Sequence, residues 1–196
     1  MTAQPHEPLT LAEFIAWELR QESKHEFVEG RVYGFAGGTI EHAAIAGALL
    51  TALHSHLRGG PCRAYGSDIM IATGQSGRYA DVVVTCDERD HAPKTVTLHR
   101  PRLVVEVLSE STAAVDRGEK LDEYRTIGTL QEYILIDSRK PWVETYRRAG
   151  DEWIASLPLA GGKLHLVSVD LTLDLDEIYA ESGVGIGASA PPLALD

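Results

Sequence analysis

The stretch Leu103-Val104-Val105-Glu106-Val107-Leu108 decides the fold, and Tyr79-Ala80-Asp81-Val82-Val83-Val84 shares its pattern. Each stretch combines one carboxylate with apolar, largely β-branched residues, which is typical of a buried strand. A buried strand rarely tolerates an ionised side chain without a partner. If the two strands lie side by side, Asp81 and Glu106 meet at one point, where a hard, oxygen-preferring cation such as Mg²⁺ balances them. The sequence therefore predicts a carboxylate metal site.

The composition of the chain limits the classes of protein to which it can belong. The 196 residues are 44% hydrophobic, which is enough for one well-cored domain. The chain has no apolar run of membrane length and no signal-peptide pattern, so we expect a cytoplasmic protein without membrane contact. The formal net charge of −11 argues against tight, non-specific binding of nucleic acid. It leaves room for weak, local contact with DNA assisted by a metal ion.

The two cysteines, Cys62 and Cys86, make neither a disulfide framework nor a zinc motif. We interpret them as small apolar residues in or near strands, with a reactive thiol as the less favoured alternative.

Periodicity and turn signals organise the chain as one domain. A capping box at Thr10–Glu13 predicts a short helix to about Leu19, and alternation around Gly30 predicts a β-hairpin over residues 25–35. Leucine and isoleucine recurring every four residues predict a long helix over Ile40–Leu57. Further strands are expected at 62–64, 67–71, 80–86, 103–108, 132–136, 143–148 and 153–157, and further helices at 115–127 and 175–179. We predict a flexible N-terminus (1–9), one domain (10–181) and a disordered tail (182–196). This order favours an α/β or α+β fold, in which helices flank a mixed β-sheet and additional β-hairpins accompany it.

Asp116, Lys120 and Tyr124 are spaced by four residues, so they share one helix face. A solvated face with a surface Asp–Lys pair explains this spacing equally well, and we prefer that interpretation for Asp116 and Glu123. Lys120 differs, because a helix packed directly after the Glu106 strand brings its amine to the carboxylates.

The order of these motifs resembles the PD-(D/E)XK nuclease superfamily. In particular it resembles the restriction endonuclease family long catalogued as a bacterial domain of unknown function. The matching segments are Tyr79-Ala80-Asp81, Glu106-Val107-Leu108-Ser109-Glu110-Ser111-Thr112, Asp116 to Tyr124, Glu132-Tyr133-Ile134-Leu135-Ile136-Asp137, the hairpin residue Glu26 and the helix residue His42. The resemblance covers nearly the whole domain and implies a restriction-endonuclease-like fold.

The resemblance also implies residue roles. Asp81 and Glu106 are expected to hold Mg²⁺ or Mn²⁺, with the backbone carbonyl of Val107 as a third ligand. Leu108 stands where the superfamily pattern places its lysine, which implies that the amine has migrated to Lys120. Lys120 is then expected to position or activate the attacking water and to stabilise transition-state charge.

Two further residues are expected to act at the site. Glu26 completes it as an orienting group or through a metal-bound water, whereas a solvated hairpin glutamate is the alternative. His42 contacts phosphate or donates a proton, whereas a helix-start histidine facing solvent is the alternative. For Asp81 and Glu106 the alternatives are a strand cap and a structural salt bridge.

Three functions remain open at this point. The first is a metal-dependent endonuclease that hydrolyses DNA phosphodiester bonds. The others are a non-enzymatic binding module that retains the nuclease fold, and a phosphoesterase acting on a small phosphorylated substrate. An exposed apolar edge strand could support a homodimer. Candidate DNA contacts, most of them interpreted as ordinary solvated charge, are Arg58, Arg63, Arg100, Arg102, Arg139, Lys140, Arg147 and Arg148.

Overall fold

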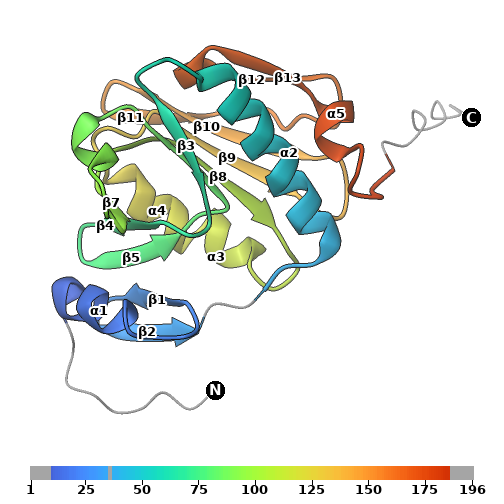
Figure 1. The fold of residues 1–196 in the computed structure, drawn as a ribbon. Coiled ribbons are helices and arrows are strands. Elements are labelled where there is room, and N and C mark those ends of the chain that lie inside the picture. The colour runs from blue at the N-terminus through green and yellow to red at the C-terminus, as the bar shows by residue number, and fades with distance from the viewer. Residues whose placement is uncertain (1–9, 35–36, 186–196) are drawn as a thin grey trace, which may run out of the picture.

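A computed structural model describes residues 10–34 and 37–185. The strands are β1 His25–Val28, β2 Arg31–Gly34, β3 Arg63–Gly66, β4 Met70–Thr73, β5 Ser76–Tyr79, β6 Val82–Thr85, β7 Thr97–Leu98, β8 Pro101–Leu108, β9 Glu132–Asp137, β10 Val143–Ala149, β11 Glu152–Ala155, β12 Lys163–Leu166 and β13 Leu171–Asp174. The helices are α1 Leu11–Glu18, α2 Ile40–Leu57, α3 Ala113–Arg117, α4 Glu119–Arg125 and α5 Leu175–Tyr179, with 3₁₀ turns at Glu88–His91 and Val167–Val169. The fold is a mixed α+β architecture with sheets flanked by helices (Figure 1).

The central sheet has six strands in the order β11-β10-β9-β8-β6-β3. β8 and β9 are parallel, and their connection carries α3 and α4, as a crossover between parallel strands requires. β6 runs antiparallel to β8 with Val82 opposite Val105. Because Asp81 directly precedes Val82, this register brings it beside Glu106.

Helices cover both faces of this sheet (Figure 1). On one face, Val105 and Val107 pack with α2 and α5 in a large apolar cluster. On the other face, Val104 and Leu108 pack with α3 and α4. Glu106 alternates with Val105 and Val107 along β8, so it points to the α3–α4 face.

A second sheet, ordered β2-β1-β5-β4-β7, joins the N-terminal hairpin to the rest of the domain. The hairpin and α1 lie together at one end of the molecule (Figure 1). Phe14, Phe27, Met70 and Tyr79 form the buried contact beneath them. The β1 strand pairs with β5 at Phe27 and Gly77, which places the hairpin next to the segment that leads to Asp81.

The predicted helices at Ile40–Leu57 and Leu175–Tyr179 are confirmed. The helix expected over 115–127 is instead two short helices that meet at Gly118. Strands β5, β7, β12 and β13 were not predicted, and the strand expected at 67–71 begins at Met70. No helix among the described residues is long and apolar enough to cross a membrane.

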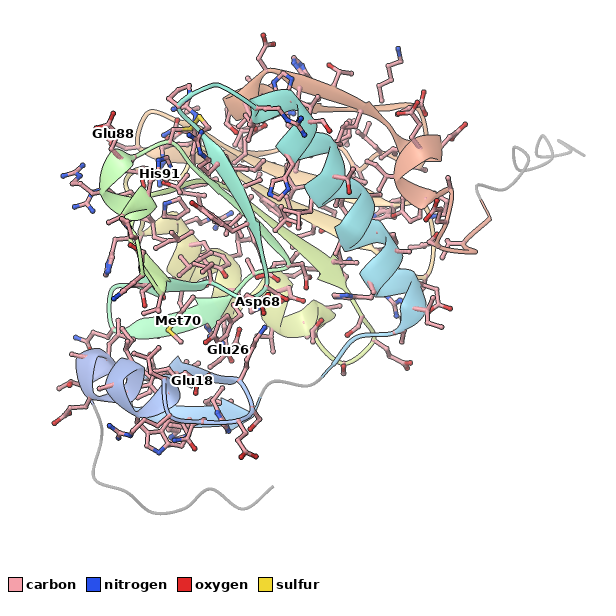
Figure 2. All side chains as sticks on the ribbon, in the orientation of Figure 1. Glu18, Glu26, Asp68, Met70, Glu88 and His91 are labelled. Atoms are coloured by element: carbon pink, nitrogen blue, oxygen red, sulfur yellow. A yellow bond between two sulfur atoms is a disulfide. The ribbon has the colours of Figure 1, made fainter. Side chains whose placement is uncertain are left out.

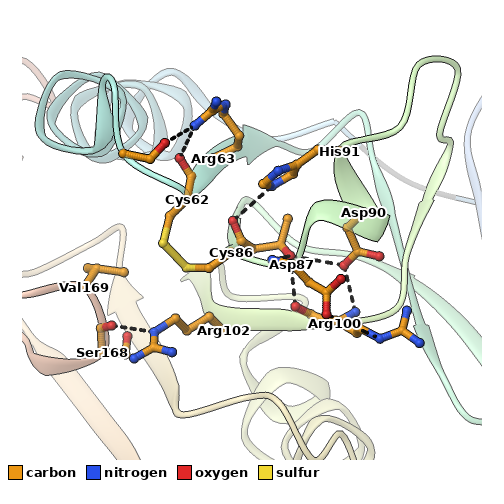
Figure 3. Close-up of a disulfide and its surroundings, with 12 residues drawn as sticks. Cys62, Arg63, Cys86, Asp87, Asp90, His91, Arg100, Arg102, Ser168 and Val169 are labelled. Atoms are coloured by element: carbon orange, nitrogen blue, oxygen red, sulfur yellow. Dashed lines mark hydrogen bonds and ion pairs between the residues drawn. A yellow bond between two sulfur atoms is a disulfide. The ribbon is translucent and has the colours of Figure 1, made fainter.

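The interpretation of the cysteines as unlinked apolar residues is wrong, because Cys62 and Cys86 form a disulfide (Figure 3). Cys62 directly precedes β3 and Cys86 directly follows β6. Since Arg63 pairs with Thr85 in that ladder, the two cysteines face each other across it. The disulfide therefore links β3, an edge strand of the central sheet, covalently to its neighbour β6.

The predicted tail lies partly within the described chain. Ser182 is buried, and its hydroxyl donates to the Tyr179 carbonyl (2.7 Å). Val184 packs against the core. Residues 186–196 of the predicted tail, like the predicted flexible N-terminus over 1–9, lie outside the described residues.

Candidate active site

Asp81 is fixed against β8 by a backbone hydrogen bond. It lies between β5 and β6, and its side chain is 11% exposed. The Val107 N–H donates to Asp81 Oδ2 (2.7 Å), and His42 Nε2 lies 3.2 Å from the same oxygen. The structure thus places the first predicted carboxylate beside the backbone of the second strand.

Glu106 is buried on the α3–α4 face of β8. Its Oε1 accepts hydrogen bonds from Lys120 Nζ (3.0 Å) and from the Tyr124 hydroxyl (3.2 Å). Tyr124 is fully buried and shares the helix face of Lys120. The sequence placed Tyr124 in a motif but gave it no role, whereas the structure shows that it contacts the carboxylate.

The Lys120 ammonium contacts three carboxylates of the site. Nζ lies 3.0 Å from Glu106 Oε1, 3.3 Å from Asp116 Oδ1 and 3.5 Å from Glu26 Oε1. It also donates to the Tyr79 carbonyl (3.3 Å). Burial lowers the pKa of Lys120, but the three carboxylates outweigh burial and raise that pKa above its ordinary value. Lys120 is therefore a cation at neutral pH.

The expectation that Asp116 and Glu123 are solvated is wrong. Asp116 is 2% exposed, and its Oδ1 accepts no hydrogen bond of regular geometry from the described residues although Lys120 Nζ is near. Burial raises the pKa of Asp116, and the Lys120 charge only partly offsets this effect. The Glu123 side chain is 19% exposed and is paired with Arg78.

Arg78 is the site residue that sequence reasoning missed. It is 3% exposed within β5. Its Nε and Nη2 donate to Glu123 (2.9 and 2.6 Å), and its Nη1 donates to Glu26 Oε2 (3.1 Å). Figure 2 shows Glu26 where the hairpin meets the rest of the domain. An arginine inside the strand Ser76–Tyr79, three residues before Asp81, was the available signal.

His42 faces the site and not open solvent. It lies in the first turn of α2 and is half-buried. The contact with Asp81 raises the pKa of His42; burial opposes this shift and the Val107 carbonyl adds to it. His42 therefore holds its proton to higher pH than a free histidine.

The site holds more negative than positive charge. Burial raises the pKa of Glu106 well above its ordinary value. Lys120 lowers that pKa, whereas Asp116, Asp81 and Glu26 each raise it further. Two permanent cations, Lys120 and Arg78, lie among five carboxylates, those of Asp81, Glu106, Asp116, Glu26 and Glu123, so the ionised site has room for an additional cation.

The donor set fits a hard divalent ion. Neither Asp81 Oδ1 nor Glu106 Oε2 accepts a hydrogen bond from the described residues, because their bonds go to Oδ2 and Oε1. Within 10–34 and 37–185, no three side chains of His, Cys, Asp or Glu form a ready-made metal cluster. A cation held by Asp81 and Glu106 would thus complete its shell with backbone oxygen and water, as Mg²⁺ commonly does.

Most candidate DNA-contacting arginines have structural partners. Arg148 donates to the carbonyls of Leu130, Arg125 and Ile127. The other pairings are Arg63 with the Gly60 carbonyl, Arg100 with Asp87, Arg102 with the Ser168 carbonyl (Figure 3), Arg139 with Asp137, and Arg147 with Glu132. These contacts fix the direction of each guanidinium, and the carboxylates of Asp137 and Glu132 also neutralise Arg139 and Arg147.

Comparison with known proteins agrees with this architecture. Residues 11–176 match the Uma2 family, described as "Putative restriction endonuclease". Two proteins of Synechocystis sp. (strain ATCC 27184 / PCC 6803 / Kazusa) are similar. The uncharacterized protein slr1290 is 38% identical over 89% of this chain and 93% of its own length. The uncharacterized protein sll1609 is 36% identical over 74% of this chain and 85% of its own length.

A solved structure shares the fold. It is described as "a putative nuclease belonging to DUF820" from Anabaena variabilis ATCC 29413. The two chains superpose with a TM-score of 0.73 at 20% identity, covering 89% of this chain and 99% of the other. The restriction-endonuclease-like fold expected from the sequence is confirmed.

Proposed function

We propose, from the premise that this chain belongs to the Uma2 family of "Putative restriction endonuclease" proteins, that it is a metal-dependent endonuclease hydrolysing DNA phosphodiester bonds. The observation that carries the proposal is that Lys120 contacts Glu106 while Asp81, from the neighbouring strand, is bound to the backbone of the next residue, Val107, so that the three side chains share one site with surplus negative charge. Membership of the family supports a nuclease-like function, and the site chemistry suggests how it operates.

Asp81, Glu106 and the Val107 carbonyl are the groups that would hold Mg²⁺ or Mn²⁺. When bound, such an ion supplies charge neutralisation at the scissile phosphate and a more acidic water. Asp81 is held for this task by the Val107 N–H, and Glu106 by Lys120 and Tyr124. These bonds leave one oxygen of each carboxylate for the cation.

Lys120 contributes charge and not a base. Because its pKa is raised, its ammonium stays protonated at working pH and stabilises negative charge that develops on the phosphate. Glu26 and Asp116 hold that ammonium in place from two further sides. His42, whose pKa is raised next to Asp81, is the group that can contact a phosphate oxygen or give a proton to the leaving oxygen.

One observation favours a second candidate, a phosphoesterase acting on a small phosphorylated molecule. The net charge is −11, and most of the arginines that could track a DNA backbone are bound to carbonyls or carboxylates. A small substrate needs fewer cationic contacts than a duplex. The two candidates share the site and differ only in what enters it.

The test is cleavage of plasmid, branched and single-stranded DNA, alongside a panel of nucleotides and phosphomonoesters, with Mg²⁺ or Mn²⁺ and with EDTA. Asp81→Asn and Glu106→Gln are expected to lose cleavage, and Lys120→Met to lose about 100-fold in kcat. Asp122→Asn, on the exposed side of α4, is the matched control and is expected to keep full activity.

Three outcomes separate the functions. Cleavage of DNA that survives in Asp81→Asn and Glu106→Gln would overturn the site assignment. Turnover of phosphomonoesters without cleavage of DNA would favour the small-molecule phosphoesterase. No turnover of any substrate, together with no Mn²⁺ binding by calorimetry, would favour a non-enzymatic binding module.

A further inference from the structure

Arg78 is buried at the point where three separate segments meet. It lies on β5, it pairs with Glu26 on β1, and it pairs with Glu123 on α4. We infer that Arg78 is a positioning residue: it holds Glu26 and, through Glu26, the Lys120 ammonium in the arrangement that the site requires. This inference rests on the proposed function and adds a residue to it.

The hydrogen bonds define how Arg78 acts. Nε and Nη2 of the Arg78 guanidinium donate to the two carboxylate oxygens of Glu123 (2.9 and 2.6 Å), and this bidentate contact fixes the plane of the guanidinium. The remaining arm, Nη1, donates to Glu26 Oε2 (3.1 Å). Glu26 Oε1 then accepts the Tyr79 N–H (3.0 Å) and lies 3.5 Å from Lys120 Nζ. Each carboxylate oxygen of Glu26 thus accepts a hydrogen bond, one from Arg78 and one from the Tyr79 N–H, and these two bonds orient Glu26 toward the Lys120 ammonium.

Arg78 does not touch the groups proposed to hold the metal ion. Its ion pairs within the described residues go to Glu26, Glu123 and the largely exposed Glu119 (3.5 Å). Asp81 and Glu106 have their own partners on β8 and α4. Loss of Arg78 should therefore disturb the placement of Lys120 first, because Asp81 keeps its hydrogen bond from the Val107 N–H and Glu106 keeps its hydrogen bond from the Tyr124 hydroxyl.

The geometry also explains why lysine cannot replace Arg78. A guanidinium presents donors in a rigid plane and can bind two carboxylates at once, whereas an ammonium is a point charge on a flexible stem. With Arg78→Lys the positive charge remains but Glu26 and Glu123 cannot both be held in register. Without that orientation, Glu26 keeps the Tyr79 N–H on one oxygen but loses the contact on the other, so its carboxylate can rotate and Lys120 can shift with it. A displacement of about 1 Å costs roughly 100-fold in rate.

A double-mutant cycle tests this chain of contacts. The variants are Arg78→Lys, Arg78→Gln, Glu26→Gln and the doubles, each measured for kcat, KM, Mn²⁺ affinity and melting temperature. Arg78→Lys is expected to lower kcat about 100-fold with KM and Mn²⁺ affinity within twofold of the parent. In the Glu26→Gln background the same change should cost less than threefold. Arg117→Lys, which alters a comparable bidentate pair with Glu144 away from the site, is the control.

A readout independent of turnover is the ¹⁵N-¹H signal of the Lys120 ammonium, assigned by its disappearance in Lys120→Arg. A buried ammonium exchanges its protons slowly enough to be observed. Arg78→Lys and Glu26→Gln are expected to shift this signal similarly, whereas Arg117→Lys leaves it unchanged. This measurement stands even if the parent cleaves no DNA, so failure of the proposed function and failure of this inference are separable.

Two results would overturn the inference. The first is an additive cycle, in which Arg78→Lys costs as much without Glu26 as with it. The second is an unmoved Lys120 signal in a folded Arg78→Lys protein. If Arg78→Gln fails to fold, Arg78→Lys and Glu123→Gln carry the test, because Glu123→Gln loosens the guanidinium and is expected to reproduce the shift.

Discussion

Glu106→Gln is expected to make the protein more stable at neutral pH in the absence of metal, although it removes a proposed metal ligand. The Glu106 carboxylate is buried among Asp116, Asp81 and Glu26, and burial is the main cause of its raised pKa. Glutamine keeps the shape and removes the charge. Lys120 is not left unpaired, because Asp116 and Glu26 remain within 3.3 and 3.5 Å of Nζ.

The magnitude follows from proton linkage. In the unfolded chain a glutamate ionises with a pKa of about 4.3, whereas in the folded chain Glu106 keeps its proton to higher pH. Between these two values the folded state binds one proton more than the unfolded state. The free energy of unfolding then falls by about 1.4 kcal/mol for each unit that the pH rises. The loss stops once the pH exceeds the folded pKa.

The assay is urea unfolding in EDTA from pH 4.5 to 8.5 for the parent, Glu106→Gln and the exposed control Glu152→Gln. Glu106→Gln should show a shallower decline with pH than the parent and should be the more stable protein at pH 8. Glu152→Gln should follow the parent. A parallel decline in Glu106→Gln, or lower stability than the parent at pH 8, would refute the claim that ionising Glu106 destabilises the folded protein in EDTA.

Three further predictions concern the same site and the sheet that carries it. Binding of Mn²⁺ should release protons, because burial raises the pKa values of Glu106 and Asp116 and a cation favours their ionised forms. Calorimetry in two buffers of different ionisation enthalpy measures this release as a difference between the two heats of binding. Identical heats would contradict the prediction. Tyr124→Phe should lower kcat about tenfold, since its hydroxyl orients Glu106, and an unchanged kcat in a folded variant would remove that role. Replacing Cys62 and Cys86 with serine should lower the free energy of unfolding by about 3 kcal/mol, since their bridge spans a separation of 24 residues. Reductant should lower the stability of the parent to the same extent in urea unfolding, and a parent indifferent to reductant would contradict the bridge.

The sequence predicted the part of the site that depends on local connections. Glu106 and Lys120 are separated by 14 residues, and the crossover connection that follows β8 carries Lys120 on its second helix, α4. A strand followed by its crossover helix leaves few ways to arrange these two side chains. Asp81 was predicted because its β-branched neighbours identify a buried strand; that this strand pairs with β8 was a condition of the prediction, and the structure shows the pairing.

The parts that sequence reasoning missed depend on distant segments docking together. Arg78 lies 52 residues from Glu26 and 45 from Glu123 in sequence, and nothing local indicates that the hairpin packs beside β5. Asp116 was misjudged for another reason. Its spacing from Lys120 fixes the helix face but not the depth at which that face is buried, and the break at Gly118 changes the path of the helix.

The disulfide illustrates the same limit. Cys62 and Cys86 are partners because β3 pairs with β6 in a register that opposes Arg63 to Thr85. The sequence indicated both strands but not that they are neighbours. Two cysteines without a spacing motif cannot reveal their pairing until the order of the strands is known.

The most direct test of the central claim is the anomalous scattering of Mn²⁺ in a crystal of this protein soaked in the ion. The account predicts one strong peak within roughly 2.0–2.4 Å of an oxygen from each of Asp81, Glu106 and the Val107 backbone, with the Lys120 ammonium still beside Glu106. A peak bound elsewhere, with these oxygens empty at saturating Mn²⁺, would contradict it.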